Sequence, residues 1–537
     1  MARVPGAIVV ALLYAPPSRG APPALLDNLG SHHHPVTASS PVAQSYFDQG
    51  LRLVYGFRPD EAERAFREAA NRDPRCAMAW WGVALALAPS IDRPPDLERT
   101  REAAEAIEKA RSLTRYASEA ERGYIEALAK RYSPAPVVDG TAPPDREYAR
   151  AMGEHSRRYP DDLDGATLYA ASLMDLRPWK LWTLRGKPAE GTEEIVSILE
   201  AVLRRDPDHP GANHYFIHAV EASPHPERAL PSAKRLETLM PGAGHLVHLP
   251  AHVYMRTGDY AAATRASQAA AQVHDPHRDP TRPRGRDATL DASRNLHFLA
   301  ASAMMQGRLS LAKAAADRAA AEAAPLADKL QEAERLTPLP YFVSLRFQRW
   351  DEILSYPEPG PDLPTTKALW RFVRGVAFAA KADLVSADAE RTAFEAARAL
   401  APPGDVFGRN ASKYVLRVAS RVLTARVAAA KHDRNGTLHW WMKSVEAQEE
   451  LAFDQPPAWY YPVRESLGAE MLRGGDVQQA EAVFRADLAR NPRNPRSLFG
   501  LRAALEAQGK AAEAKRVDEE LQAAWKNAEV RLRIEDL

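Results

Sequence analysis

A set of apolar and small residues recurs along this chain at intervals of about 34 residues. In residues 43–74 the set follows helical spacing on both sides of a break near Phe57. Its members are Tyr46, Gly50, Leu53, Ala62, Phe66, Ala69 and Pro74. Small residues such as Gly50 and Ala62 let two helices approach closely, and a proline ends the second helix. The set therefore predicts a pair of packed helices.

The same spacing returns at the other end of the chain. A unit beginning at Tyr461 contains Leu467, Gly468, Gly475, Ala480, Phe484 and Pro492, and a unit beginning at Pro495 contains Leu498, Leu501, Gly509 and Ala514. This pattern resembles the tetratricopeptide repeat, and the resemblance covers most of residues 43–525. It implies an all-α fold, an α-solenoid of helix pairs that forms a right-handed superhelix with a concave inner face.

The repeats and the flanking composition divide the chain into six parts. These are a signal peptide (1–20), an irregular lead-in (21–42), N-terminal repeats (43–209), central histidine-rich repeats (210–326), divergent helical repeats (327–450) and C-terminal repeats (451–537). Residues 1–20 carry one early charge, a short apolar core from Ala7 to Ala15, and small residues near a cleavage point. We therefore expect a periplasmic or secreted protein.

Composition excludes some partners and some sources of stability. The formal net charge of +1 gives no electrostatic reason to bind nucleic acid or acidic membranes. No internal stretch approaches the roughly 20 apolar residues that span a bilayer. Cys76 is the single cysteine, so no internal disulfide can form, and we expect it to be a small buried residue at a helix start.

Histidines recur in register in the central repeats. His214 and His218 are four residues apart, as are His248 and His252, and the second pair follows the first by 34 residues. In the tetratricopeptide family the second, fifth, ninth and twelfth positions of each first helix face the concave groove. Counting from Pro210, Gly244 and Ser293, the resemblance implies that these positions hold His214, His218, Glu221, His245, His248, His252 and His297.

This spacing predicts a metal site. Residues four apart on a helix have β-carbons roughly 6 Å apart, so both imidazoles can reach one ion. First helices of neighbouring units lie about 10 Å apart, which brings the two pairs together. We predict ligation by His214, His218, His248 and His252, with His245, His297 and Glu221 as further ligands or outer contacts. Imidazole suits zinc, copper or iron, and Glu221 is the candidate catalytic base.

Two functions stay open at this point. One is an exported metal-binding repeat protein, and whether it is also an enzyme is undecided. His214-Tyr215-Phe216-Ile217-His218 lacks the glutamate of the HExxH motif, so no protease mechanism follows. The chain resembles exported bacterial tetratricopeptide proteins with a histidine-rich central groove, for which no reaction is established. The other function is a non-catalytic scaffold whose groove receives a peptide, a protein or a small molecule.

Other segments allow two interpretations each. The tract His32–His34 is either solvated or metal-binding, and Trp179 and Trp182 in the 177–188 insertion either cap the groove or pack against its edge. Met255 and Met304 share one groove position, as copper ligands or as plain lining. Glu465 takes a groove position in a late repeat and would face the histidines if the superhelix curls enough.

Overall fold

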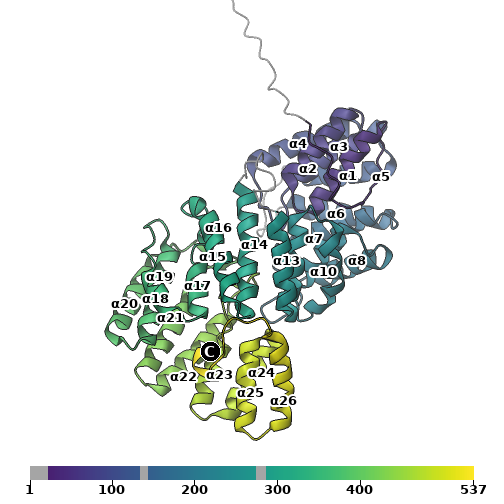
Figure 1. The fold of residues 1–537 in the computed structure, drawn as a ribbon. Helices are drawn as coiled ribbons and strands as arrows, with labels where there is room; N and C mark the ends of the chain where they lie inside the picture. Colours follow the sequence, from purple (N-terminus) through teal and green to yellow (C-terminus); the bar gives the residue numbers. More distant parts are fainter. Residues whose placement is uncertain (1–21, 133–142, 274–285) are drawn as a thin grey trace, which may run out of the picture.

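The computed structural model describes residues 22–132, 143–273 and 286–537, so the predicted signal peptide lies outside the described residues. These residues form helices packed in consecutive pairs (Figure 1). Within them the one sheet is a hairpin of two short strands, β1 (Val406–Phe407) and β2 (Asn410–Ala411). The predicted all-α solenoid is confirmed.

The helices follow one another with short connections. The first part contains α1 (Pro41–Tyr55), α2 (Pro59–Arg72), α3 (Ala77–Leu87), α4 (Leu97–Ser112), α5 (Glu119–Lys130), α6 (Pro143–Arg158), α7 (Leu163–Asp175) and α8 (Thr192–Arg205). The central part contains α9 (Pro210–Val220), α10 (Leu230–Leu239), α11 (Gly244–His248), α12 (Pro250–Thr257), α13 (Tyr260–Val273), α14 (Arg286–Met305) and α15 (Leu309–Ala323).

The later helices continue the array to the C-terminus. They are α16 (Gln331–Glu334), α17 (Leu339–Arg346), α18 (Trp350–Ser355), α19 (Pro364–Ala380), α20 (Leu384–Leu400), α21 (Ser412–Ala430), α22 (Arg434–Glu449), α23 (Arg464–Arg473), α24 (Val477–Arg490), α25 (Pro495–Ala507) and α26 (Ala511–Ala524). Short 3₁₀ turns lie at Thr114–Tyr116, Pro226–Ala229, Ala324–Leu326 and Ile534–Asp536.

The repeated glycines and phenylalanines pack as the sequence pattern predicts. The ring of Phe66 on α2 lies against Gly50 on α1 and Gly82 on α3, where an added β-carbon would come within 2.6 and 2.3 Å of it. Near the C-terminus, Phe484 on α24 lies in the same way against Gly468 and Gly500. One large ring thus fills the gap between three helices, and glycine is the residue that leaves room for it.

The first helix of the second central unit is broken, which the spacing did not predict. It ends at His248, and α12 starts at Pro250. Proline has no N–H to donate and its ring clashes with the preceding turn, so the helix cannot run through. The break lies between His248 and His252.

The array closes on itself at both ends. At the N-terminal side the ring of Tyr55, at the end of α1, lies against Gly211 on α9. At the C-terminal side Pro492 packs on Gly258, where a β-carbon would lie 2.1 Å from the Pro492 carbonyl oxygen. Glu529 donates its backbone N–H to the Gly307 carbonyl, 3.0 Å away. Figure 1 shows α14 in the centre of the molecule, with the C-terminal helices below its lower end.

Three apolar cores hold the closed array together. The first joins residues 29–266 with Phe298, the second runs from 290 to 467, and the third from 469 to 537. The domain boundaries predicted at 209/210, 326/327 and 450/451 rest on the sequence repeats alone. In the described part of the chain we find no helix with the length and apolar character needed to cross a membrane. Cys76 is buried at the start of α3.

Candidate metal centre

His214 is held in one orientation by the first repeat. It lies on α9, is fully buried, and its Nδ1 is 2.6 Å from the carbonyl oxygen of Tyr55. A carbonyl oxygen only accepts hydrogen bonds, so the proton of a neutral His214 is on Nδ1. Nε2 of His214 therefore carries a lone pair.

His218 lies one turn later on α9 and is oriented by a carboxylate. Its Nδ1 donates to Oε1 of Glu221 at 2.8 Å. Its Nε2 is buried and has no hydrogen-bond partner among the described residues. The ring therefore presents an unpaired Nε2 to the interior.

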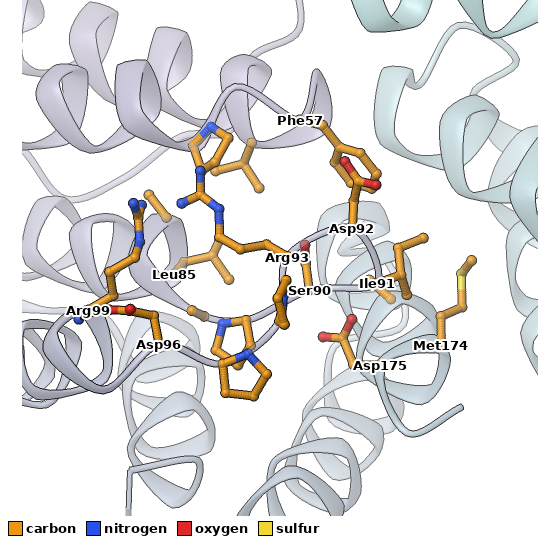
Figure 2. Close-up of a pocket in the computed structure, with 18 of the residues that line it drawn as sticks. Phe57, Leu85, Ser90, Ile91, Asp92, Arg93, Asp96, Arg99, Met174 and Asp175 are labelled. Atoms are coloured by element: carbon orange, nitrogen blue, oxygen red, sulfur yellow. Dashed lines mark hydrogen bonds between the residues drawn. The ribbon is translucent and has the colours of Figure 1, made fainter. Parts of the chain in front are cut away.

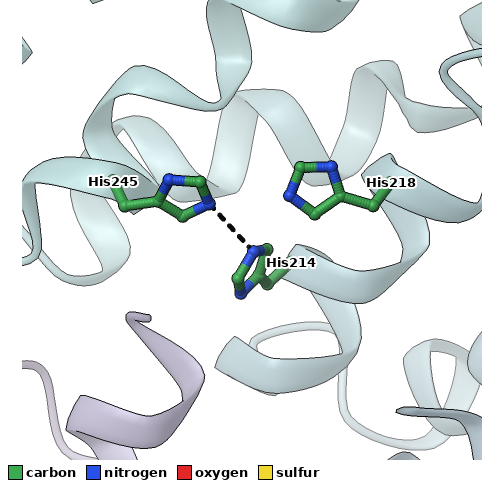
Figure 3. Close-up of side chains that lie close together, drawn as sticks. All are labelled: His214, His218 and His245. Atoms are coloured by element: carbon green, nitrogen blue, oxygen red, sulfur yellow. Dashed lines mark hydrogen bonds between the residues drawn. The ribbon is translucent and has the colours of Figure 1, made fainter. Parts of the chain in front are cut away.

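His245 on α11 completes a triangle of imidazoles. Its Nε2 lies 3.1 Å from Nε2 of His214, and the three histidines offer ligand atoms within 4.8 Å of one another. Figure 3 shows ring nitrogens of all three directed at a common space. Ligand nitrogens 2.0–2.1 Å from a tetrahedral ion are about 3.3 Å apart, and the 3.1 Å between His214 and His245 is close to this value.

The second histidine pair lies beside the triangle and is joined to it by Glu221. Nδ1 of His252, on α12, donates to Oε2 of Glu221 at 2.6 Å. Nε2 of His252 is 3.1 Å from Nε2 of His248. Glu221 thus holds one imidazole on each oxygen, and the four paired histidines form a chain rather than one cluster. His218, Glu221 and His252 also lie within 4.8 Å of one another.

The charge states suit ligation. Burial alone would raise the pKa of the Glu221 carboxyl, but the adjacent imidazoles of His252 and His218, which both hydrogen-bond to it, hold this pKa well below its ordinary value, so Glu221 is ionised. Burial, and then neighbouring imidazoles, hold the pKa of His214 and of His245 well below 6.5. Burial also lowers the pKa of His252, despite Glu221. Neutral imidazole is the form that binds metals.

The histidines are buried, whereas we expected them to line an open groove. His214, His218, His248 and His252 are each at most 6% exposed. The ring of Phe57, in the turn between α1 and α2, lies 4.2 Å from that of His214 and 5.0 Å from that of His245. Trp179 lies edge-on to His218 at 5.1 Å. The array curls tightly enough for its first turn and the 177–188 insertion to cover the site, so Trp179 caps it.

His297 is not brought to this centre. Its neighbour Phe298 packs on the rings of His248 and His252, at 4.3 and 4.5 Å. His297 instead lines a separate cavity. Consecutive residues on a helix point about 100° apart, so a shift of one residue in the register of α14 exchanges the two side chains.

Two further expectations have outcomes. Glu465 pairs with Arg346 in the interior and does not face the histidines. His32 and His34 are mostly buried and both bind Asp164, with 2.9 Å between the bonded atoms. They are therefore not solvated, although His33 is half exposed. Sequence reasoning missed Phe57 and the Tyr55 carbonyl, and neither has a local signal that points to the histidines.

A cavity of about 680 Å³ lies next to the centre on the far side of Phe57 (Figure 2). Phe57 and Tyr215 line this cavity and also stack on the histidines. Arg93, Arg99 and Asp92 stand on its wall. Phe57 has a φ of 51°, a conformation that costs a non-glycine residue free energy.

The packing of the helix pairs identifies the fold. Phe66 and Phe484 fill equivalent gaps between three helices at opposite ends of the chain. The chain has the tetratricopeptide-repeat fold. No family model matches this repeat protein, and no curated protein does.

Three solved structures that resemble this repeat protein, IFIT1, Cut9 and Tom70, are tetratricopeptide-repeat proteins. Alignment with the human IFIT1 dimer with m7Gppp-AAAA covers 92% of this chain and 91% of that one, at 12% identity and a TM-score of 0.34. Alignment with yeast Tom70 covers 92% of this chain and 93% of that one, at 12% identity and a TM-score of 0.30. Alignment with the APC/C hetero-tetramer Cut9-Hcn1 covers 90% of this chain and 74% of that one, at 13% identity and a TM-score of 0.29. Likeness this low carries no functional argument. The absence of a nucleic-acid partner stays a prediction.

Proposed function

We propose that this repeat protein binds one transition-metal ion, zinc, copper or iron, through Nε2 of His214, His218 and His245. One observation carries the proposal. The Nδ1 protons of two of these rings are held by the Tyr55 carbonyl and the Glu221 carboxylate, so both Nε2 lone pairs are directed at the space that His245 also faces. Ligating histidines in proteins are oriented by such outer hydrogen bonds.

Three protein ligands leave a fourth position on a tetrahedral ion. A metal bound here would supply Lewis acidity and a bound water of lowered pKa. The 680 Å³ cavity behind Phe57 is large enough for a substrate, and the side chain of Phe57 would have to move to connect it to the metal centre. Both oxygens of Glu221 are engaged by imidazoles, which supports a role in orienting ligands over the role of general base.

The alternative is an interaction scaffold that needs no metal, and the repeat fold itself supports binding of other proteins. The two functions differ in what they ask of the histidines. A scaffold has no use for the buried Nε2 of His218, which has no hydrogen-bond partner among the described residues, because such a group costs free energy when nothing binds it. An exported location remains a proposal that rests on residues 1–20.

Metal analysis of the chain without a polyhistidine tag separates the functions. We expect about one ion per chain after reconstitution, and less than about 0.2 ion per chain refutes the metal site. His245→Ala should abolish uptake with unchanged helix content. His225→Ala is the matched control, since His225 lies on the surface with 69% of its side chain exposed. His248→Ala with His252→Ala should retain an ion, because neither residue belongs to the triangle.

A further inference from the structure

Segment 22–39 lies along the N-terminal repeats as an extended chain. Its residues, all of them described, form no helix or strand, and from residue 31 on exposed and half-buried residues alternate. Successive side chains of an extended chain point to opposite sides, so His32, His34 and Val36 face the helices. Leu29, 1% exposed, is the one buried residue of this described range. The segment therefore rests on the repeats as a bound peptide would.

Side chains of the repeats bind the backbone of this segment. Gln44 on α1 accepts from the Val36 N–H at 2.9 Å and donates to the His34 carbonyl at 2.8 Å. The backbone N–H groups of four residues also end on repeat side chains, namely those of Leu26, His34, Thr37 and Ser39 on Gln49, Asp48, Glu121 and Asp73. Main-chain hydrogen bonds hold an extended peptide whatever its sequence, and alternate side chains supply the specificity.

His32 and His34 supply the contacts that depend on sequence. Nε2 of His32 and Nδ1 of His34 each lie 2.9 Å from one oxygen of Asp164, which is on α7 and 6% exposed. Burial opposes the charged form of His34, but the hydrogen bond and the charge of Asp164 outweigh it and raise the pKa of His34 above 6.5. Residues two apart in an extended chain share a face, so this spacing places two basic side chains on one carboxylate.

A cavity of about 890 Å³ lies beside segment 22–39, with residues 29–35 in its wall. Six carboxylates also line it, those of Glu121, Asp161, Asp162, Asp164, Asp206 and Asp208. Two of these carboxylates pair with arginines, Arg205 and Arg235. Arg158, which is also on the wall, pairs with Glu119. Carboxylates therefore still outnumber cations along the cavity, and the charge favours a basic ligand.

We propose that this acidic groove, formed by Asp48, Asp73, Glu121, Asp164 and the cavity beside them, binds an extended segment of another polypeptide with basic side chains at alternate positions. Segment 22–39 occupies the groove until such a partner replaces it. Exchange is feasible because the segment is held mainly by polar contacts, which water can replace. The groove does not include the triangle of histidines, so its occupation does not require a metal.

A cleavable form of the full chain tests the proposal. A protease site is inserted between Ser39 and Ser40, which leaves Ser40 as the N-cap of α1. After cleavage, a peptide of residues 22–39 with fluorescein on Pro22 is added, and its anisotropy is followed. We expect saturable uptake of one peptide per chain. Absence of uptake by the folded, cleaved protein overturns the proposal.

Peptide variants test the contacts without changing the fold of the repeats. A peptide with His32→Ala and His34→Ala should bind roughly tenfold or more weakly, because it loses both bonds to the buried carboxylate. His33→Ala is the matched control: His33 faces the other way, its side chain is half exposed, and its loss should weaken binding at most about threefold. Equal affinity of the two variant peptides contradicts the assignment of the groove.

Ser31 tests the preference for a basic partner. It is exposed and lies on the wall of the acidic cavity. At low ionic strength the Ser31→Lys peptide should bind about fivefold more tightly than the Ser31→Glu peptide, because the carboxylates attract one and repel the other. Equal or reversed affinities overturn the basic character of the partner.

Discussion

Replacing Glu221 by glutamine tests the arrangement of the metal centre. The carboxylate accepts one hydrogen bond from His218 and one from His252, whereas an amide offers one oxygen and one NH₂ group. If the amide oxygen faces His218, the triangle keeps its tautomer. If it faces His252, the proton of His218 moves to Nε2, and that nitrogen cannot bind a metal. Glu221→Gln therefore weakens metal binding through His218.

The expected loss is 10- to 100-fold in metal affinity, which is typical for outer hydrogen bonds to ligating histidines. This corresponds to about 1.4–2.7 kcal/mol. The lower end applies if the amide turns its oxygen to His218, and the upper end applies if it turns to His252. Loss of the buried negative charge beside a cation acts in the same direction.

The assay is competition for zinc with a chromophoric chelator. Glu227→Gln is the matched control, because Glu227 also accepts from a histidine, His225 at 3.1 Å, but on the surface. This control should bind zinc like the unchanged protein. Equal affinity in the Glu221→Gln and Glu227→Gln proteins would refute the reasoning, provided that both have full helix content.

Two further predictions concern stability. Phe66→Ala should lower the free energy of unfolding by about 3–5 kcal/mol, because it empties the gap between α1, α2 and α3; urea denaturation measures this, and a loss below 1 kcal/mol would contradict the packing. The metal-free protein should lose stability as pH falls. His214 and His245 have folded pKa values below the ordinary 6.5, and Glu221 has one below 4.5, so the unfolded chain binds more protons in each case. The melting temperature should therefore be flat near pH 8 and fall below pH 6.5; a constant value down to pH 5 would contradict these charge states.

The fold could be predicted because its signal is local. Phe66, Gly50 and Ala62 specify a helix pair within one stretch of 34 residues, and each pair packs on the next. His214 and His218 are likewise fixed by their spacing on one helix. The break at Pro250 follows from the proline itself. The register of α14 depends instead on packing between units, and for that reason the position of His297 was not predictable.

The residues that cover the metal centre cannot be predicted from the spacing of residues in the sequence. Tyr55 and Phe57 precede His214 by more than 150 residues. They reach it because small rotations between successive units add up until α1 touches α9, and no single unit encodes that sum. The same applies to His32 and His34, whose partner Asp164 belongs to the fourth helix pair.

The contact between Pro492 and Gly258 changes how such a repeat array should unfold from its ends. An open repeat array loses structure from its ends, since a terminal unit has one neighbour. Here Tyr260 donates to the Pro492 carbonyl, and Ser310 donates to Glu529, across more than 200 residues of chain. The last repeats are therefore anchored on the middle of the protein. Unfolding from the C-terminus must therefore first break these contacts. During synthesis, the central repeats can reach their native packing only after the ribosome has completed the final repeats.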